Sequence, residues 1–138
     1  MHRDLNPLLK RLAEARRMEK EQTLFYRSLA AAAEEQGRAA ESERLNELHA
    51  DEQHHLSRLT ARILELGGEP EDLPGGLREA ALDDWESRAR TREEEEIRFY
   101  RRVLDEGSLD KETRAVVDEI MESEQHHRRH LGGKWMSA

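Results

Sequence analysis

The chain has 138 residues, a formal net charge of −8 and no cysteine, and its length suits one domain with a single core. Its arginines are interleaved with glutamates, which argues against nucleic acid as a main partner because phosphate binding needs a basic face. The lack of cysteine excludes disulfides, thiolate zinc sites and iron–sulfur clusters, so any metal must be bound by oxygen and nitrogen. Ala, Glu, Lys, Leu and Arg fill 79 of the 138 positions, a bias typical of long helices.

Apolar runs are short throughout the sequence. The longest is Leu29 to Ala33, and the first residues lack the apolar stretch of a secretory signal. No membrane partner is therefore expected, and the protein is predicted to be cytoplasmic.

Turn-forming residues divide the chain into four predicted helices. The main break is the Gly- and Pro-rich stretch 67–76, and weaker breaks occur at 35–37 and 105–108. The predicted organisation is a single domain with a first helical hairpin at about 4–66, a linker at 67–76 and a second hairpin at about 77–131. The predicted fold class is all-α, a four-helix bundle.

The two predicted hairpins are repeats of each other. With an offset of 74, the matching residues of the first and third helices are Glu19, Glu21, Phe25, Tyr26 and Arg27 on Glu93, Glu95, Phe99, Tyr100 and Arg101. With an offset of 72, the second and fourth helices match at Glu47, Glu52, Gln53, His54, His55 and Leu59 on Glu119, Glu124, Gln125, His126, His127 and Leu131. A shorter turn in the second hairpin accounts for the difference of two residues.

Each predicted helix carries an apolar stripe at heptad spacing, which marks its buried face. The stripe positions, in chain order, are Leu5, Leu8, Leu12, Ala15, Glu19, Gln22, Tyr26, Leu29 and Ala33; Leu45, Leu48, Glu52, His55 and Leu59; Leu82, Ala89, Glu93, Glu96, Tyr100 and Val103; and Val117, Ile120, Glu124, His127 and Leu131. A polar pair thus interrupts every stripe. A single Glu-x-x-His match is expected by chance, but two matches at equivalent repeat positions on the buried face are not.

The four polar pairs are predicted to meet in one layer of the bundle. Glu19 and Glu52 are 18 and 15 residues from Gly37, and the carboxylates of the second hairpin are 14 and 17 residues from its turn. Isolated carboxylates in an apolar core are costly, and the stripes offer no Lys or Arg at this height. Two divalent metal ions would compensate the charge, and two Glu plus two Glu-x-x-His is the ligand pattern of di-iron and di-manganese carboxylate bundles.

These residues resemble the rubrerythrins, a family within the ferritin-like superfamily. The residues that look like the two halves of a rubrerythrin site are Glu19, Tyr26, Glu52 and His55, and then Glu93, Glu96, Tyr100, Glu124 and His127. The resemblance implies a ferritin-like four-helix bundle whose cofactors are two iron ions, with manganese as the other candidate. The cysteine-ligated rubredoxin module that many rubrerythrins carry is absent from this chain.

The resemblance also implies a role for each site residue. The implied metal ligands are Glu52 and Glu124 as bridges, Glu19 and Glu93 as terminal carboxylates, His55 and His127 as one imidazole per ion, and Glu96 as a mobile seventh ligand and catalytic residue. The implied supporting residues are Tyr26, Tyr100, Gln22 and Asp51. Of these, Asp51 would orient an opposing histidine, and Ser123 takes the corresponding place in the other repeat. Glu96 is expected to exchange with His55 as the metals change oxidation state.

The predicted function is that of a di-iron oxidoreductase, a rubrerythrin-like peroxidase or ferroxidase that reduces hydrogen peroxide or oxidises ferrous iron with oxygen or peroxide. Storage or handling of iron, in a larger assembly or a protein shell, is the alternative from the binding class. A third alternative is manganese catalase-type activity. Because the chain has no rubredoxin module, peroxide reduction would need an external electron donor.

The predicted linker bears on the assembly. Its ten residues span at most about 33 to 36 Å, which is close to the length of the bundle that they must follow. We therefore expect a homodimer, with hairpins exchanged between the two chains as one arrangement.

Overall fold

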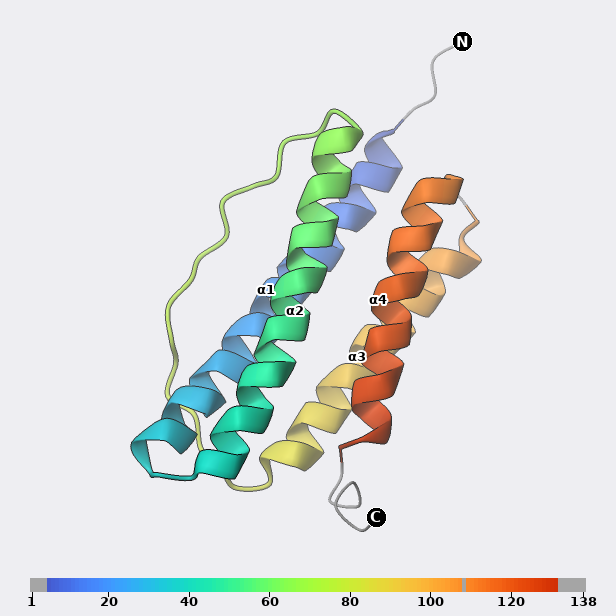
Figure 1. The fold of residues 1–138 in the computed structure, drawn as a ribbon. Coiled ribbons are helices and arrows are strands. Elements are labelled where there is room, and N and C mark those ends of the chain that lie inside the picture. The colour runs from blue at the N-terminus through green and yellow to red at the C-terminus, as the bar shows by residue number, and fades with distance from the viewer. Residues whose placement is uncertain (1–4, 108, 132–138) are drawn as a thin grey trace.

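The computed structural model describes residues 5–107 and 109–131, and this part of the chain contains four helices. They are α1 (Asn6–Glu35), α2 (Ala39–Glu65), α3 (Trp85–Asp105) and α4 (Lys111–Arg129). Figure 1 shows two helical hairpins, α1 with α2 and α3 with α4, that pack into one bundle. The predicted all-α four-helix bundle is confirmed. The expected start of the first hairpin, residue 4, lies outside the described residues.

The connection between α2 and α3 is longer than the sequence pattern indicated. The third helix was expected from about residue 77, whereas α3 begins at Trp85, so this boundary was wrong. The physical reason is length: α2 has 27 residues and rises about 40 Å, more than the reach of a ten-residue linker. Residues 66–84 instead run along the outside of the first hairpin to the end where α3 starts (Figure 1). Leu82 is buried as expected, but in this connection and not in a helix.

Side chains of α1 hold the connection against the bundle. Arg16 donates to the carbonyl oxygen of Glu71 at 2.6 Å, and the backbone N–H of Arg78 donates to Oγ of Ser28 at 3.0 Å. The guanidinium of Arg78 also pairs with Glu21. The long segment therefore has defined partners, and one chain brings all four helices together.

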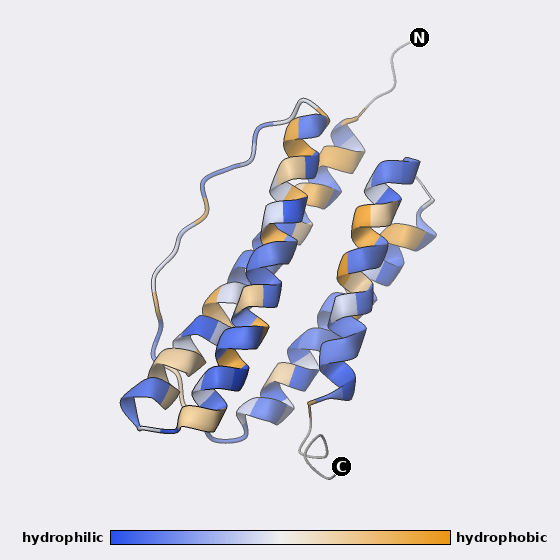
Figure 2. Cartoon of the chain, in the orientation of Figure 1, coloured by the Kyte–Doolittle hydropathy of each residue, from blue (hydrophilic) through white to orange (hydrophobic). Residues whose placement is uncertain are grey.

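The buried apolar residues form two clusters, one toward each end of the bundle. The first cluster consists of Tyr26, Leu29, Ala30, Ala33, Leu45, Leu48, Leu82, Trp85, Ala89 and Leu131. The second consists of Leu8, Leu12, Ala15, Leu59, Ile63, Tyr100, Val116, Val117 and Ile120. Figure 2 shows hydrophilic positions along the middle of the helices as well as on the outside. The predicted stripes are buried as expected, apart from the half-buried Leu5, so the polar pairs lie inside the bundle between the clusters.

No helix in the described residues is both long enough and apolar enough to cross a membrane.

A buried arginine connects the start of α4 to α2. Asp110 caps α4: its Oδ2 accepts from the backbone N–H of Thr113 at 3.2 Å, and its Oδ1 accepts from the Thr113 hydroxyl at 2.6 Å. Arg62, which is 7% exposed, donates to the same Oδ2 at 2.9 Å and to Oγ1 of Thr113 at 2.9 Å. Burial alone would raise the pKa of Asp110, but the Thr113 hydrogen bonds and the Arg62 charge outweigh it and lower the pKa.

The first prediction concerns this cap. Asp110→Ala is expected to lower the free energy of unfolding by about 1 to 2 kcal/mol, because it removes a helix cap and leaves Arg62 with fewer partners. Chemical denaturation at pH 7 measures this change. The control is Asp118→Ala, at an exposed position in the middle of α4, which should leave the stability near that of the wild type.

The pH dependence of the same variant follows from the lowered pKa. A lowered pKa in the folded state stabilises the protein above the usual value of 3.8 and stops doing so as the pH falls through the folded-state pKa. The difference between wild type and Asp110→Ala should therefore shrink below pH 3.8. An equal difference at pH 7 and in acid would contradict a role for the charge.

Candidate metal centre

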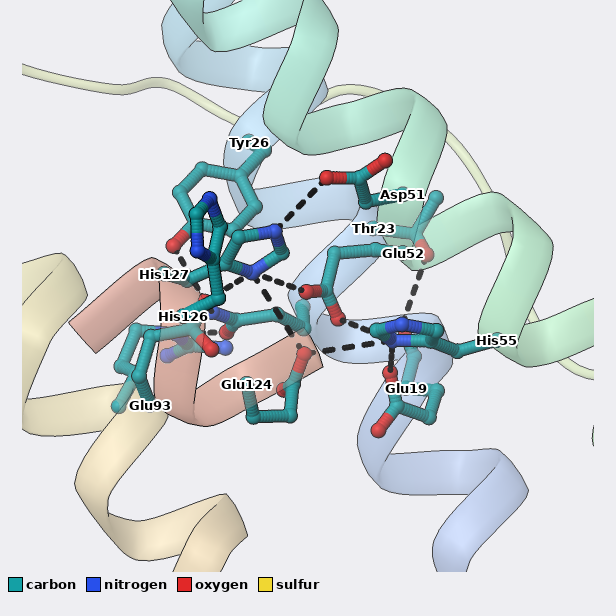
Figure 3. A network of polar contacts seen from close by, with 12 residues as sticks. Glu19, Thr23, Tyr26, Asp51, Glu52, His55, Glu93, Glu124, His126 and His127 are labelled. Atoms are coloured by element: carbon teal, nitrogen blue, oxygen red, sulfur yellow. Dashed lines mark hydrogen bonds and ion pairs between the residues drawn. The ribbon is translucent and has the colours of Figure 1, made fainter. Parts of the chain in front are cut away.

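Six of the seven predicted ligands converge in the middle of the bundle. They form two groups: Glu19, Glu52, His55 and Glu124, which we call position 1, and Glu52, Glu93, Glu124 and His127, which we call position 2. Within each group the candidate ligand atoms all lie within 4.8 Å of one another. Glu52 and Glu124 belong to both groups, which places them between the two positions (Figure 3).

Helix geometry explains this convergence. Residues three apart on an α-helix lie on one face, so Glu52 and His55 of α2 point inward together, as do Glu124 and His127 of α4. The four glutamates of the two groups have no exposed surface, and the imidazoles are 3% and 4% exposed. The site is thus closed to bulk water by the helices that build it.

Each imidazole presents its Nδ1 atom to three carboxylates. Nδ1 of His55 lies 3.3 Å from Oε1 of Glu19, 3.3 Å from Oε1 of Glu124 and 3.6 Å from Oε2 of Glu52. Nδ1 of His127 lies 3.3 Å from Glu52, 3.5 Å from Glu93 and 3.6 Å from Glu124. The two ring centroids are 6.4 Å apart.

Many of these atoms are close together without forming hydrogen bonds. Among the described residues, the buried polar atoms without a hydrogen-bond partner are both carboxylate oxygens of Glu52 and Glu124, Oε1 of Glu93, Oε1 of Glu96 and Nδ1 of His127. Buried polar atoms are normally satisfied, and each exception needs a cause. Here all of them belong to the predicted ligands. Carboxylate oxygens and an imidazole nitrogen that have no hydrogen-bond partner are free to coordinate a metal ion. These atom types suit hard or borderline cations such as iron or manganese.

The pKa values reflect the crowding of negative charge. Burial raises the pKa of Glu19, Glu93 and Glu124 above the usual 4.5, and the charge of Glu52 raises each of them further. Burial would raise the pKa of Glu52 as well, but its contacts with His127 and His55 outweigh burial and lower it. The metal-free site therefore favours protons on most of its carboxylates.

The pKa values of the imidazoles are raised as well, but for a different reason. Burial alone would lower their pKa, but contacts with the surrounding carboxylates raise the pKa of His55 to about 10 and that of His127 to about 12. These raised pKa values favour cationic rings in the absence of metal, and cationic rings would balance part of the buried negative charge. Metal ions would have to replace these protons, because a ligating imidazole is neutral.

Glu96, the seventh predicted ligand, is buried next to the two groups but belongs to neither. Its side chain is 3% exposed, and burial followed by the charge of Glu19 raises its pKa well above 4.5. The expected exchange of Glu96 with His55 stays a prediction.

The predicted supporting residues contact the ligands directly. The hydroxyl of Tyr26 donates to Oε2 of Glu93 at 2.6 Å, and that of Tyr100 donates to Oε2 of Glu19 at 2.6 Å, so each repeat supports the other repeat's carboxylate. Asp51 lies 2.8 Å from Nε2 of His127, as expected for a residue that orients an opposing histidine. This contact leaves Nδ1 of the ring directed at the carboxylates (Figure 3).

One supporting interaction was missed by the sequence analysis. Nε2 of Gln22 donates to Oε2 of Glu93 at 3.1 Å, and Nε of Arg92 donates to Oε1 of Gln22 at 2.7 Å. Gln22 was predicted to support the site, but Arg92 was not singled out. Arg92 of α3 lies off the buried stripe and acts on the site only through Gln22 of α1. Neither the helical spacing nor the repeat predicts such a contact between helices.

Comparison with known proteins places the chain in a family. The family model described as Rubrerythrin matches residues 10–133. No curated protein sequence matches the chain. Among solved structures, the Desulfovibrio desulfuricans bacterioferritin, described with a di-iron site in different catalytic states, matches with a TM-score of 0.82. That match has 23% sequence identity and covers 91% of this chain and 75% of the other, so it supports the ferritin-like fold alone.

The family match runs from residue 10 within α1 to beyond the end of α4 and includes every residue of the two ligand groups. The chain therefore belongs to the rubrerythrin family.

Proposed function

We propose that the protein binds two metal ions, iron in the first instance, and acts as an oxidoreductase that reduces hydrogen peroxide or oxidises ferrous iron. The observation that carries the proposal is the set of buried carboxylate oxygens without hydrogen-bond partners, most of them on Glu52 and Glu124, which both ligand groups share. Membership of the rubrerythrin family supports the choice of iron.

Each side chain of the site has a proposed role. Glu52 and Glu124 would bridge the ions, Glu19 with His55 would complete position 1, and Glu93 with His127 would complete position 2. Two bound iron ions would supply the electrons that peroxide or oxygen takes up. The surrounding residues exclude water and hold the ligands: the apolar clusters cover the layer at both ends, and the tyrosine hydroxyls fix the terminal carboxylates.

The source of electrons separates the two activities. In peroxide reduction the iron must be reduced again after each turnover, and an external electron donor would have to do so because the chain has no cysteine-bound redox centre. In ferrous iron oxidation the substrate iron is itself the donor. Storage of iron would follow from the second activity if the product accumulated in a large assembly.

A homodimer stays the proposed assembly, but the connection 66–84 is longer than the ten-residue linker from which it was predicted. The described chain forms a complete four-helix layer by itself, since both hairpins contribute ligands to each position. An exchange of hairpins between chains is therefore not required to build the site.

The second prediction tests metal binding. Carefully loaded wild-type protein should contain about two iron or manganese ions per chain by elemental analysis. Glu52→Ala combined with Glu124→Ala should abolish this binding, because it removes the carboxylates that both positions share. Glu47→Gln combined with Glu122→Gln changes two exposed glutamates of the same helices and should bind as the wild type does. Wild-type protein without stoichiometric metal would refute the proposal.

The third prediction concerns Glu96. Without Glu96, the other four buried glutamates (−4) balance two ferrous ions (+4) but leave two ferric ions (+6) with an excess charge of +2, which the Glu96 carboxylate reduces to +1. Glu96→Gln should therefore bind ferrous iron nearly as the wild type does but slow its oxidation by peroxide about 10- to 100-fold, the usual range for changes around metal ligands. Stopped-flow oxidation measures the rate, with Glu95→Gln, at an exposed neighbour, as the control. An unchanged rate would remove Glu96 from the mechanism.

The fourth prediction is a pH dependence of the metal-free protein. Glu19, Glu93, Glu96 and Glu124 have pKa values above 4.5 in the folded state, so the folded state binds more protons and its stability falls as the pH rises above 4.5. Among the five buried glutamates, Glu52 is the one whose pKa is lowered, so it acts in the opposite sense. Above pH 6.5 the raised pKa values of the histidines add to the loss.

Differential scanning calorimetry with a chelator present tests this dependence. The unfolding temperature should fall between pH 5 and pH 8 by at least roughly 4 °C, the shift expected of about 1 kcal/mol. Glu19→Gln combined with Glu124→Gln should flatten the dependence, and added divalent metal should reverse it because cations replace the protons. A metal-free protein that is more stable at pH 8 than at pH 5 would contradict this prediction.

A further inference from the structure

The two metal positions are unequal although they come from repeated hairpins. With the offset of 74, Gln22 of α1 corresponds to Glu96 of α3, and Met18 corresponds to Arg92. The terminal carboxylate of position 2, Glu93, accepts hydrogen bonds from a tyrosine hydroxyl and from an amide. The terminal carboxylate of position 1 accepts a tyrosine hydroxyl but no amide among the described residues.

Arg92 determines which way the Gln22 amide points. An arginine side chain can only donate hydrogen bonds, so the group that it contacts at 2.7 Å must be the amide oxygen. The amide nitrogen of Gln22 then faces Glu93, where it donates at 3.1 Å. Arg92 is itself held in place, because its guanidinium carbon lies 4.4 Å from the ring centroid of Phe25.

The histidine of position 2 is also better supported. Nε2 of His127 contacts Asp51 at 2.8 Å, which directs Nδ1 toward the site. Nε2 of His55 has no hydrogen-bond partner in the part of the chain that the structure describes, and Ser123 takes the place that corresponds to Asp51. Both terminal ligands of position 2 are therefore fixed before any ion arrives.

We propose that Gln22, oriented by Arg92, is a positioning residue that fixes Glu93 and causes position 2 to fill before position 1. This inference rests on the proposed metal site and adds an order of binding to it. A ligand that is already in place loses less freedom when the ion binds, so a preformed position binds more tightly. Mutation of residues that hydrogen-bond to metal ligands and orient them commonly lowers metal affinity 10- to 100-fold.

The test is a titration of metal-free protein with cobalt(II), followed by calorimetry and by proton NMR. Wild type should bind two ions in separate steps, the first about 10- to 100-fold tighter. At one equivalent, the metal-shifted ring N–H signal should belong to His127, identified by its absence in His127→Gln. Gln22→Met should weaken the first step toward the second and leave the second near its wild-type value.

A second variant keeps the test independent of the buried glutamine. Arg92→Met changes a half-buried residue, frees the Gln22 amide to turn and should weaken the first step in the same direction by a smaller factor. The control, Arg98→Met, removes the same charge from an exposed position on α3 and should titrate as the wild type does.

The outcomes separate this inference from the proposed function. Failure of the wild type to bind cobalt would contradict the metal site itself. If wild type binds two ions but Gln22→Met leaves both steps unchanged, or weakens both equally, Gln22 has no positioning role for Glu93. A first shifted signal from His55 in the wild type would overturn the proposed order of filling.

Discussion

The structure depends on one electrostatic constraint, the burial of five glutamates in a single layer of a narrow helical bundle. Such a layer must gain positive charge, because unpaired carboxylates in an apolar interior are unstable. Among the described residues, the layer contains no Lys or Arg side chain, and its own cations are the two imidazoles. The raised pKa values of the buried glutamates other than Glu52 favour protons on these carboxylates, and metal ions bound at the proposed site would compete with those protons. Folding would then be linked to both proton binding and metal binding.

The rest of the fold excludes water from this layer and aligns the polar residues of the two hairpins. Apolar clusters lie on both sides of it, and Tyr26 and Tyr100 each extend from a cluster to donate to a terminal carboxylate. The long segment 66–84 lets a single chain place both hairpins with their polar layers at the same height. Arg62 and Asp110 connect α2 to the start of α4 and so tie the two hairpins together. These features stabilise a site whose own charges oppose folding.

The site consists of equivalent residues from two repeated hairpins, and differences between the repeats make positions 1 and 2 unequal. The Glu-x-x-His pairs recur in both hairpins, which explains the two similar ligand groups. Glu96 adds a buried carboxylate from α3, whereas its counterpart Gln22 in α1 is neutral and donates a hydrogen bond to Glu93 at position 2.

The sequence by itself determined the number of helices, their buried stripes and the candidate ligands, because these depend on local periodicity: residues three apart share a helix face, as Glu52 and His55 do. Tertiary structure decided what depends on contacts between helices. The late start of α3 at Trp85 follows from the length that the connection must span, which no local pattern contains. The contact of Arg92 with Gln22 joins α3 to α1 and exists only because the two hairpins pack at one relative height. A repeat specifies which side chains point inward, whereas packing alone decides which of them meet.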